Sequence, residues 1–148
     1  KNETTDSAID AIATGCYEDA RQSVEAAKAT LDVLSARYPM VLVSNFYGNI
    51  QAVLDDFKLT SYFPVVIESA VVGVRKPDPA IFRLGVEALA LQPEEVVVIG
   101  DSYRKDIQPA QSLGCDTIWI KGAGWDDSEA AVQHDKIITD IAQLQELL

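Results

Sequence analysis

The sequence predicts an α/β fold in which a parallel sheet carries helices on both faces. Short apolar runs alternate along the chain with segments whose apolar residues recur about every 3.6 positions, the period of an α-helix. The apolar runs are continuous and do not alternate with polar residues, which is typical of strands that are buried on both faces. Together, these patterns indicate strand–helix units wound into one parallel sheet.

The chain is expected to begin with helix, over residues 1 to about 37. Apolar residues recur there at helical spacing from Ile9 to Leu34, and Gly15 is a candidate break between two helices. Pro39 ends the pattern, because proline cannot continue a helix that needs its N–H. We assign residues 1–30 to a helical remnant or linker and residues 31–148 to the α/β core.

Four strands and a short fifth strand follow, separated by helices. Asp78 is placed to cap the second of these helices, Pro79 stands in its first turn, and Gly114 closes the third. The expected strands are residues 40–44, 64–69, 96–100, 116–121 and 136–139, and the expected helices are residues 46–57, 78–91, 104–114 and 141–148.

Composition narrows the class of partner. With 148 residues, 48% of them hydrophobic, the chain is long enough for one domain with its own core. Its net charge of −11, with no cluster of Lys and Arg, argues against a nucleic-acid partner. The apolar runs are too short to cross a bilayer, so no membrane partner is expected.

The ends and the cysteines give further expectations. The polar start has no visible signal peptide and no initiator Met, so we expect a fragment or a processed product. Cys16 and Cys115 lack metal-ligand spacing and are expected to be small buried or half-buried thiols. Both observations fit a reducing, cytoplasmic location.

Polar side chains stand just beyond three of the expected strands. Ser44 and Asn45 follow the first, Lys76 follows the second, and Asp101 follows the third, with Asp106 one helical turn later. Parallel strands end at one edge of the sheet, where α/β proteins bind ligands, so we expect these residues to converge. Each residue could instead be an ordinary turn, surface or helix-capping residue. This alternative is weakest for Asp101, because placing a carboxylate at the end of an apolar strand removes it from water, which is unfavourable without a compensating interaction.

The predicted cluster suits phosphate chemistry. Ser44 and the backbone N–H groups of the turn after it can donate hydrogen bonds to a phosphoryl group. Lys76 can offset negative charge on that group and on the transition state. Asp101 and Asp106 supply the oxygen ligands that Mg²⁺ prefers.

These residues also resemble a known family. The runs VLVSN, GVRKPDP and VVVIGDSYRKDI are similar to three of the four signature motifs of the haloacid dehalogenase (HAD) superfamily, in the usual order. The resemblance covers roughly residues 30–148 and implies a Rossmann-like core and phosphoryl transfer through an aspartyl-phosphate beside Mg²⁺. It implies catalytic roles for Ser44 and Lys76, substrate binding by Ser44, Asn45 and Lys76, and metal binding by Asp101 and Asp106.

The chain departs from this family at its first motif, a strand that ends in Asp-x-Asp. No Asp in the sequence is followed by another Asp two residues later; the nearest such carboxylate pair, Asp127 and Glu129, follows no apolar run. In the family that strand lies between the strands that carry Ser44 and Asp101. We therefore expect a gap there, roughly twice the normal strand spacing, filled by a second chain or a missing N-terminal segment.

Three functions fit these motifs. The leading one is Mg²⁺-dependent hydrolysis of a small phosphomonoester. A haloacid dehalogenase is the second, disfavoured because its members usually carry Ser-Asn where this chain has Gly100-Asp101. A non-catalytic phosphate- or metal-binding module is the third; a phosphoacceptor receiver domain has its acids and lysine in the reverse order.

Aromatic residues and the single histidine give weaker expectations. The resemblance also implies a helical cap over the site, of which the N-terminal helical residues resemble the tail. Phe46 and Tyr47 are expected to line the substrate entrance or to pack beneath that cap, with neither favoured. Trp119 is expected in the core, whereas Trp125 and His134 are expected at the surface.

Overall fold

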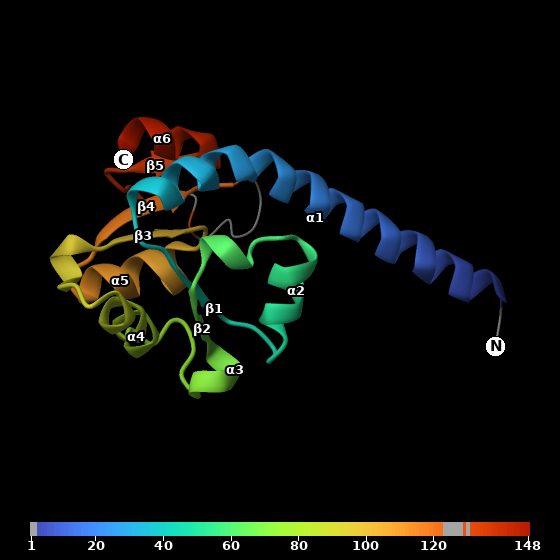
Figure 1. The fold of residues 1–148 in the computed structure, drawn as a ribbon, viewed down its shortest axis with the longest axis horizontal. Coiled ribbons are helices and arrows are strands. Elements are labelled where there is room, and N and C mark those ends of the chain that lie inside the picture. Colours follow the sequence, from blue (N-terminus) through green and yellow to red (C-terminus); the bar gives the residue numbers. More distant parts are fainter. Residues whose placement is uncertain (1–2, 123–128, 130) are drawn as a thin grey trace.

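The computed structural model describes the backbone of residues 3–122, 129 and 131–148. Side chains are described for the same residues, beginning at residue 7. Strands and helices alternate as the sequence predicted (Figure 1). The strands are β1 (Val41–Ser44), β2 (Val65–Glu68), β3 (Val97–Gly100), β4 (Asp116–Ile120) and β5 (Ile137–Ile138). The helices are α1 (Glu3–Arg37), α2 (Ile50–Asp56), α3 (Ser69–Val72), α4 (Ala80–Leu89), α5 (Gln108–Ser112) and α6 (Leu144–Leu147).

The strands form two parallel sheets. β1 pairs with β2, with Ser44 opposite Glu68 at the carboxyl end, and β3, β4 and β5 form the other sheet in that order. Every pairing is parallel, as the continuous apolar runs indicated. Within the described residues no ladder joins β1 to β3, so the sheet is divided where the sequence predicted an absent strand.

An apolar cavity of about 480 Å³ lies at this division. Its walls include Val41–Val43 of β1 and Val96–Ile99 at β3, the two strands that would flank a further strand. Ile99 is 37% exposed although it lies inside an apolar strand. Such exposure leaves apolar surface in contact with water and is unfavourable for a strand of this composition.

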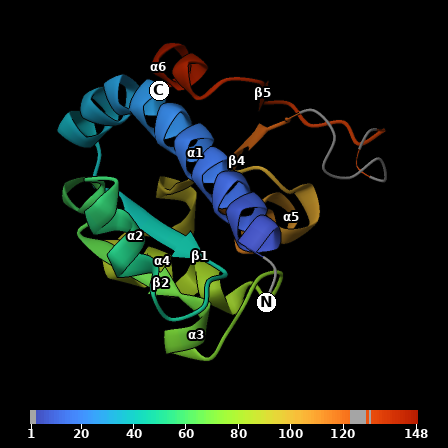
Figure 2. The same cartoon turned by 90° about the vertical axis from the view of Figure 1, so that its right-hand side faces the viewer.

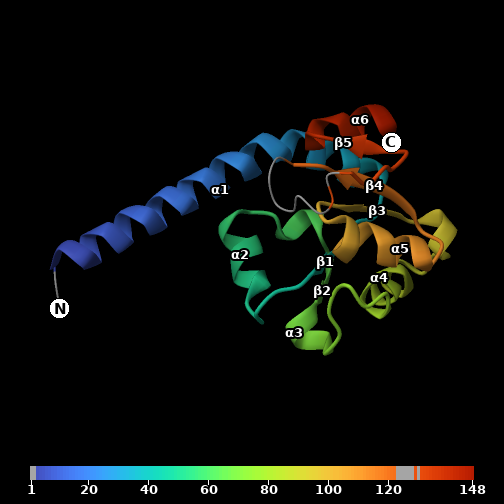
Figure 3. The same cartoon turned by 180° about the vertical axis from the view of Figure 1, so that it is seen from behind.

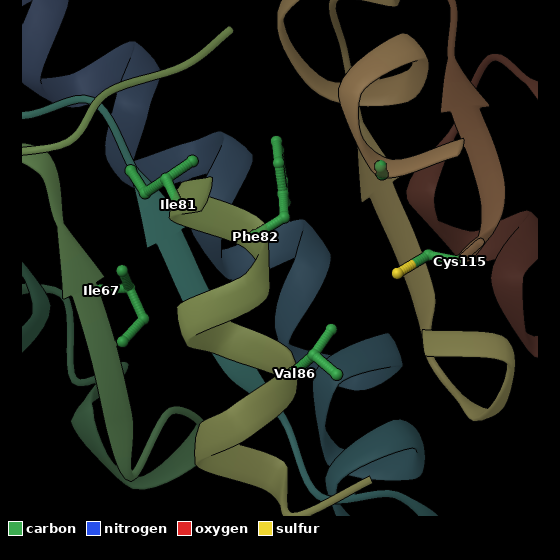
Figure 4. Close-up of a cluster of buried hydrophobic side chains, with 6 residues drawn as sticks. Ile67, Ile81, Phe82, Val86 and Cys115 are labelled. Carbon is green, nitrogen blue, oxygen red and sulfur yellow. The ribbon is translucent and has the colours of Figure 1, made fainter. Parts of the chain in front are cut away.

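Helices cover both faces of the divided sheet (Figure 2). On one face α4 packs against both halves, and its Phe82 and Val86 share a buried cluster with Ile67 and Cys115 (Figure 4). On the other face the end of α1 and the C-terminal segment bury Leu34, Leu144 and their neighbours against β4 and β5. The two halves are therefore held together by helices where strand pairing is absent.

α1 is one continuous helix, contrary to the predicted break at Gly15. A glycine inside a helix costs only about 1 kcal/mol relative to alanine, which neighbouring helix-forming residues offset. The helix also runs unbroken through the predicted domain boundary at residues 30/31, which stays a prediction. Its first half projects from the body and exposes Ile9 and Ile12 (Figures 1 and 3).

Three further expectations are corrected. The helix expected from residue 46 begins at Ile50, because residues 46–49 form a loop with Gly48 at a φ of 94°. Cys16 is exposed, since it lies on the projecting part of α1, whereas Cys115 is buried as predicted. His134 is half-buried and hydrogen-bonds Thr117 Oγ1 at 2.8 Å.

The two tryptophans have different outcomes. Trp119 is buried in β4, as predicted. Trp125, like Asp127, lies outside the described residues.

No helix in the described part of the chain is long and apolar enough to span a membrane.

Candidate functional site

A second cavity, of about 930 Å³, opens at the carboxyl ends of β1 and β3. All five residues that the sequence placed in the site line it: Ser44, Asn45, Lys76, Asp101 and Asp106. They come from the end of β1, the loop before α4, and the segment after β3. The parallel arrangement therefore brings them to one rim, as expected.

Lys76 and Asp106 form the ion pair at the centre of this rim. Lys76 Nζ lies 2.6 Å from Asp106 Oδ1, and their side chains are 17% and 5% exposed. Lys76 Nζ also lies 5.6 Å from the centroid of the Phe82 ring, which suits a partly desolvated cation. Because the pair is shielded from water, losing either partner would leave a poorly solvated charge.

The second carboxylate oxygen of Asp106 fixes the loop after β3. Oδ2 accepts a hydrogen bond from the backbone N–H of Ser102 at 3.1 Å. Residues Tyr103–Ile107 form a single π-helical turn, an element that is frequently found at functional sites. Asp106 thus joins Lys76 to the loop that presents Asp101.

Gly100 permits this arrangement because it has no side chain. A Cβ at this position would lie 2.3 Å from Asp106 Cβ and 2.7 Å from Asp106 Cγ. Both distances are far below van der Waals contact. The glycine before Asp101 is therefore required by the close approach of a site carboxylate.

Asn45 positions the backbone of Lys76. Its Oδ1 accepts from the Lys76 N–H at 2.9 Å, and its Nδ2 donates to the Lys76 carbonyl at 3.1 Å. These two bonds lock the end of β1 to the lysine segment. The side-chain amide keeps one donor hydrogen and one acceptor lone pair that could contact a substrate. Substrate binding by Asn45 stays a prediction.

Among the described residues, nothing forms a hydrogen bond or ion pair with the Asp101 carboxylate. The residue is exposed at the cavity, and its carbonyl accepts from Trp119 Nε1 at 3.1 Å, which fixes the backbone. Mg²⁺ in proteins is often held by one or two carboxylates with waters and substrate phosphate completing the shell. Asp101, with Asp106 behind it, fits that pattern, although the described residues contain no cluster of three possible metal-ligating side chains.

The loop after Ser44 differs from expectation in one respect. Its backbone N–H groups were predicted to be available to a phosphoryl group. Those of Phe46 and Gly48 are instead donated to the Ser69 hydroxyl and the Glu68 carboxylate. Two of the expected donors are therefore already used within the protein.

Sequence reasoning missed three side chains that hold the site loops: Glu68, Ser69 and Glu129. Glu129 is buried and accepts hydrogen bonds from the N–H groups of Tyr103 and Arg104 at 3.0 and 2.9 Å. Nothing in the sequence links it to a turn 25 residues earlier. Glu68 carried a readable signal, because it is an acid that ends an apolar strand, as Asp101 is.

A comparison of family profiles decides the class. The profile of the haloacid dehalogenase-like hydrolases matches residues 3–114. The chain belongs to this family of hydrolases. The HAD-like fold and the family expected from the three motifs are thus confirmed.

Related proteins include phosphatases and are longer than this chain. The glyceraldehyde 3-phosphate phosphatase of Pyrococcus furiosus is 36% identical over 93 residues, which cover 62% of this chain and 39% of the relative. The haloacid dehalogenase-like hydrolase domain-containing protein 3 of Mus musculus is 30% identical over 145 residues. That match covers 93% of this chain and 58% of the mouse protein.

Solved structures share the HAD fold. A HAD phosphatase from Thermococcus onnurineus matches with a TM-score of 0.67 and 28% identity, over 85% of this chain and 54% of that protein. A HAD hydrolase from Bacillus subtilis, crystallised with magnesium, matches with a TM-score of 0.69 and 24% identity. That second match covers 82% of this chain and 53% of the Bacillus protein.

Proposed function

We propose that this HAD-family chain carries the phosphate- and metal-binding part of a Mg²⁺-dependent phosphohydrolase for small phosphomonoesters. The observation that supports it is the meeting of Ser44, Lys76 and Asp101 at one cavity. A hydroxyl donor, a cation and a free carboxylate together suit phosphoryl transfer, in which catalysis is mostly positioning and charge stabilisation. The relatives named as phosphatases support the same reaction class.

Each residue has a distinct role in this proposal. Ser44 donates a hydrogen bond to a phosphoryl oxygen. Lys76 balances the charge of the phosphoryl group, and Asp106 holds the Lys76 ammonium in place through the 2.6 Å ion pair. Asn45 sets the position of the Lys76 backbone.

Asp101 would hold Mg²⁺, with Asp106 supporting the metal site behind it. When bound, the ion supplies Lewis-acid stabilisation of the phosphoryl oxygens and a template for the substrate. The magnesium in the Bacillus subtilis relative supports this choice of cofactor. Both oxygens of Asp106 already have donors, so Asp101 is the principal ligand offered by the described residues.

The nucleophilic acid would come from a strand seated between β1 and β3. We propose that this strand belongs to a segment that precedes residue 1 in the same polypeptide. The division of the sheet, the apolar walls of the 480 Å³ cavity and the exposed Ile99 support an additional buried strand. A parallel strand there would satisfy backbone groups that face the cavity.

Phosphate release from a panel of small phosphomonoesters tests the reaction, using the natural polypeptide with Mg²⁺ and with EDTA. We expect release that requires Mg²⁺ and falls at least about 100-fold in Asp101→Asn. Asp10→Asn, an exposed acid on α1, is the matched control and should be unaffected.

Other outcomes separate the alternatives. Full activity in EDTA contradicts the metal-dependent phosphatase. Halide release from a 2-haloacid in EDTA supports the dehalogenase, and binding of Mg²⁺ and inorganic phosphate without turnover supports a non-catalytic module.

The strand proposal has its own test, in the intact mass of the protein isolated from its source. A mass above that of residues 1–148, with slow amide exchange in β1 and β3, supports an upstream strand. A mass equal to residues 1–148 with a second polypeptide bound supports a partner chain. A mass equal to residues 1–148 with fast exchange at these edges contradicts both.

A further inference from the structure

We propose that Glu68 and Ser69 are positioning residues that fix the loop after Ser44 in its working conformation. This inference rests on the proposed function, because the loop matters only if Ser44 binds a phosphoryl group. Neither residue lies in the three motifs that pointed to the family. Both act from beneath the loop, through hydrogen bonds to its backbone.

The strand register places the two residues directly below this loop. Glu68 is the last residue of β2 and pairs with Ser44, the last residue of β1. Ser69 follows at once and begins α3. Glu68 and Ser69, together called the clamp, therefore lie at the carboxyl end of the strand that adjoins Ser44, so the sheet sets their position.

Glu68 is a buried acid whose partner lies in the loop. It is 5% exposed, and its Oε1 accepts a hydrogen bond from the Gly48 N–H at 2.5 Å. Removing a carboxylate from water is unfavourable, and a hydrogen bond to one backbone N–H offsets only part of that free energy. A buried acid at this position is therefore better explained by a role in holding the loop. Gly48 has a φ of 94°, a conformation that non-glycine residues avoid, so the carboxylate anchors the tightest point of the loop.

Ser69 anchors the other side of the same loop. The Ser69 hydroxyl accepts a hydrogen bond from the Phe46 N–H at 3.2 Å and donates one to the Phe46 carbonyl at 3.4 Å. Tyr47, between the two anchored residues, is 91% exposed. The loop thus has fixed backbone points on each side of an outward-facing aromatic residue.

The anchored loop is continuous with the rest of the site. Asn45, the first loop residue, holds the backbone of Lys76, whose ammonium pairs with Asp106. Loosening the loop would release Asn45 as well as Ser44. A misplacement of about 1 Å can lower an enzyme's rate roughly 100-fold, which makes such anchors consequential.

The direct test is amide hydrogen exchange of the natural polypeptide by NMR. In Glu68→Ala, we expect the Gly48 amide to exchange at least about 10-fold faster, while α2 keeps its protection. In Ser69→Ala, the Phe46 amide should respond in the same way. Glu68→Gln keeps an acceptor oxygen and should restore most of the protection, which separates hydrogen bonding from charge.

Kinetics of the same variants test the role in the reaction. We expect kcat/KM for phosphate release to fall roughly 10- to 100-fold in Glu68→Ala, mainly through kcat, with partial rescue in Glu68→Gln. Glu87→Ala and Ser61→Ala, both exposed and outside residues 46–49, are the matched controls.

Two results would overturn the proposal. One is an unchanged Gly48 amide in Glu68→Ala; the other is faster exchange with unchanged kcat/KM. If the wild-type protein releases no phosphate, the proposed function fails by itself, and the affinity for inorganic phosphate replaces kcat/KM. Weaker phosphate binding in Glu68→Ala than in Glu87→Ala then supports the clamp, and equal binding refutes it.

Discussion

Replacing Gly100 by alanine tests the packing of the site most directly. The added methyl group would lie 2.3 Å from Asp106 Cβ, 2.7 Å from Cγ and 2.9 Å from Oδ2. Carbon atoms in contact are normally separated by about 3.5–4.0 Å. Asp106 or the β3 backbone would therefore have to move by more than about 1 Å to remove the overlap.

The cost follows from what surrounds the overlap. Asp106 is 4% exposed and cannot turn into solvent without breaking its contacts. Overpacking of this kind typically costs about 1–3 kcal/mol, and displacing Asp106 also weakens the shielded ion pair with Lys76. We expect Gly100→Ala to lower the free energy of unfolding by about 2–4 kcal/mol in total.

Urea unfolding followed by circular dichroism measures this difference. Gly122→Ala is the matched control, because a Cβ there meets no atom of the described residues within 4 Å and the residue is exposed. Its free energy of unfolding should change by less than about 0.5 kcal/mol. An equal effect of both substitutions, or no loss in Gly100→Ala, would refute the close approach of Asp106 to Gly100.

Three other predictions concern surface charge, thiols and helix α1. Lys136 lowers the pKa of Asp116 below its ordinary 3.8 through a side-chain hydrogen bond, so the folded state gains stability above this pH and loses it on acidification. Asp116→Asn should therefore flatten the fall in Tm below pH 3.8, and an unchanged slope would contradict the ion pair. Burial raises the pKa of the buried Cys115 thiol, whereas Cys16 is exposed; a thiol reagent should label Cys16 at once and Cys115 only on unfolding. Gly15→Ala, in open space within α1, should increase helical circular dichroism, and a decrease would show that the helix breaks there.

Local sequence patterns predicted most of the secondary structure, and they failed where tertiary contacts compete. The five strands lie within two residues of their expected bounds, because continuous apolar runs have few alternatives in a buried sheet. The helix expected at residue 46 was wrong because Glu68 and Ser69 hold residues 46–48 as a loop. No pattern within that segment reveals that its backbone N–H groups donate to side chains some 20 residues later in the chain.

The candidate site shows the same contrast between what local sequence patterns predict and what tertiary contacts determine. Ser44, Lys76, Asp101 and Asp106 were readable because each polar residue follows an apolar strand, and parallel strands end at one edge. The pairing of Asp106 with Lys76, and of Asn45 with the Lys76 backbone, was not readable, since it depends on side-chain direction at that edge. The roles of Glu68, Ser69 and Glu129 needed the same spatial information.

By itself, the sequence determined the parallel α/β class, the residues that converge at the rim and the place where the sheet divides. The first two follow from local hydrophobic pattern and strand order, whereas the place of the division follows from the resemblance to the HAD family, in which a further strand lies between those that carry Ser44 and Asp101. Only the tertiary structure decided which atoms meet. Hydrogen bonds and ion pairs act over distances of a few ångströms between residues far apart in the chain, so the packing of β1 against β2 and of Gly100 against Asp106 determines them.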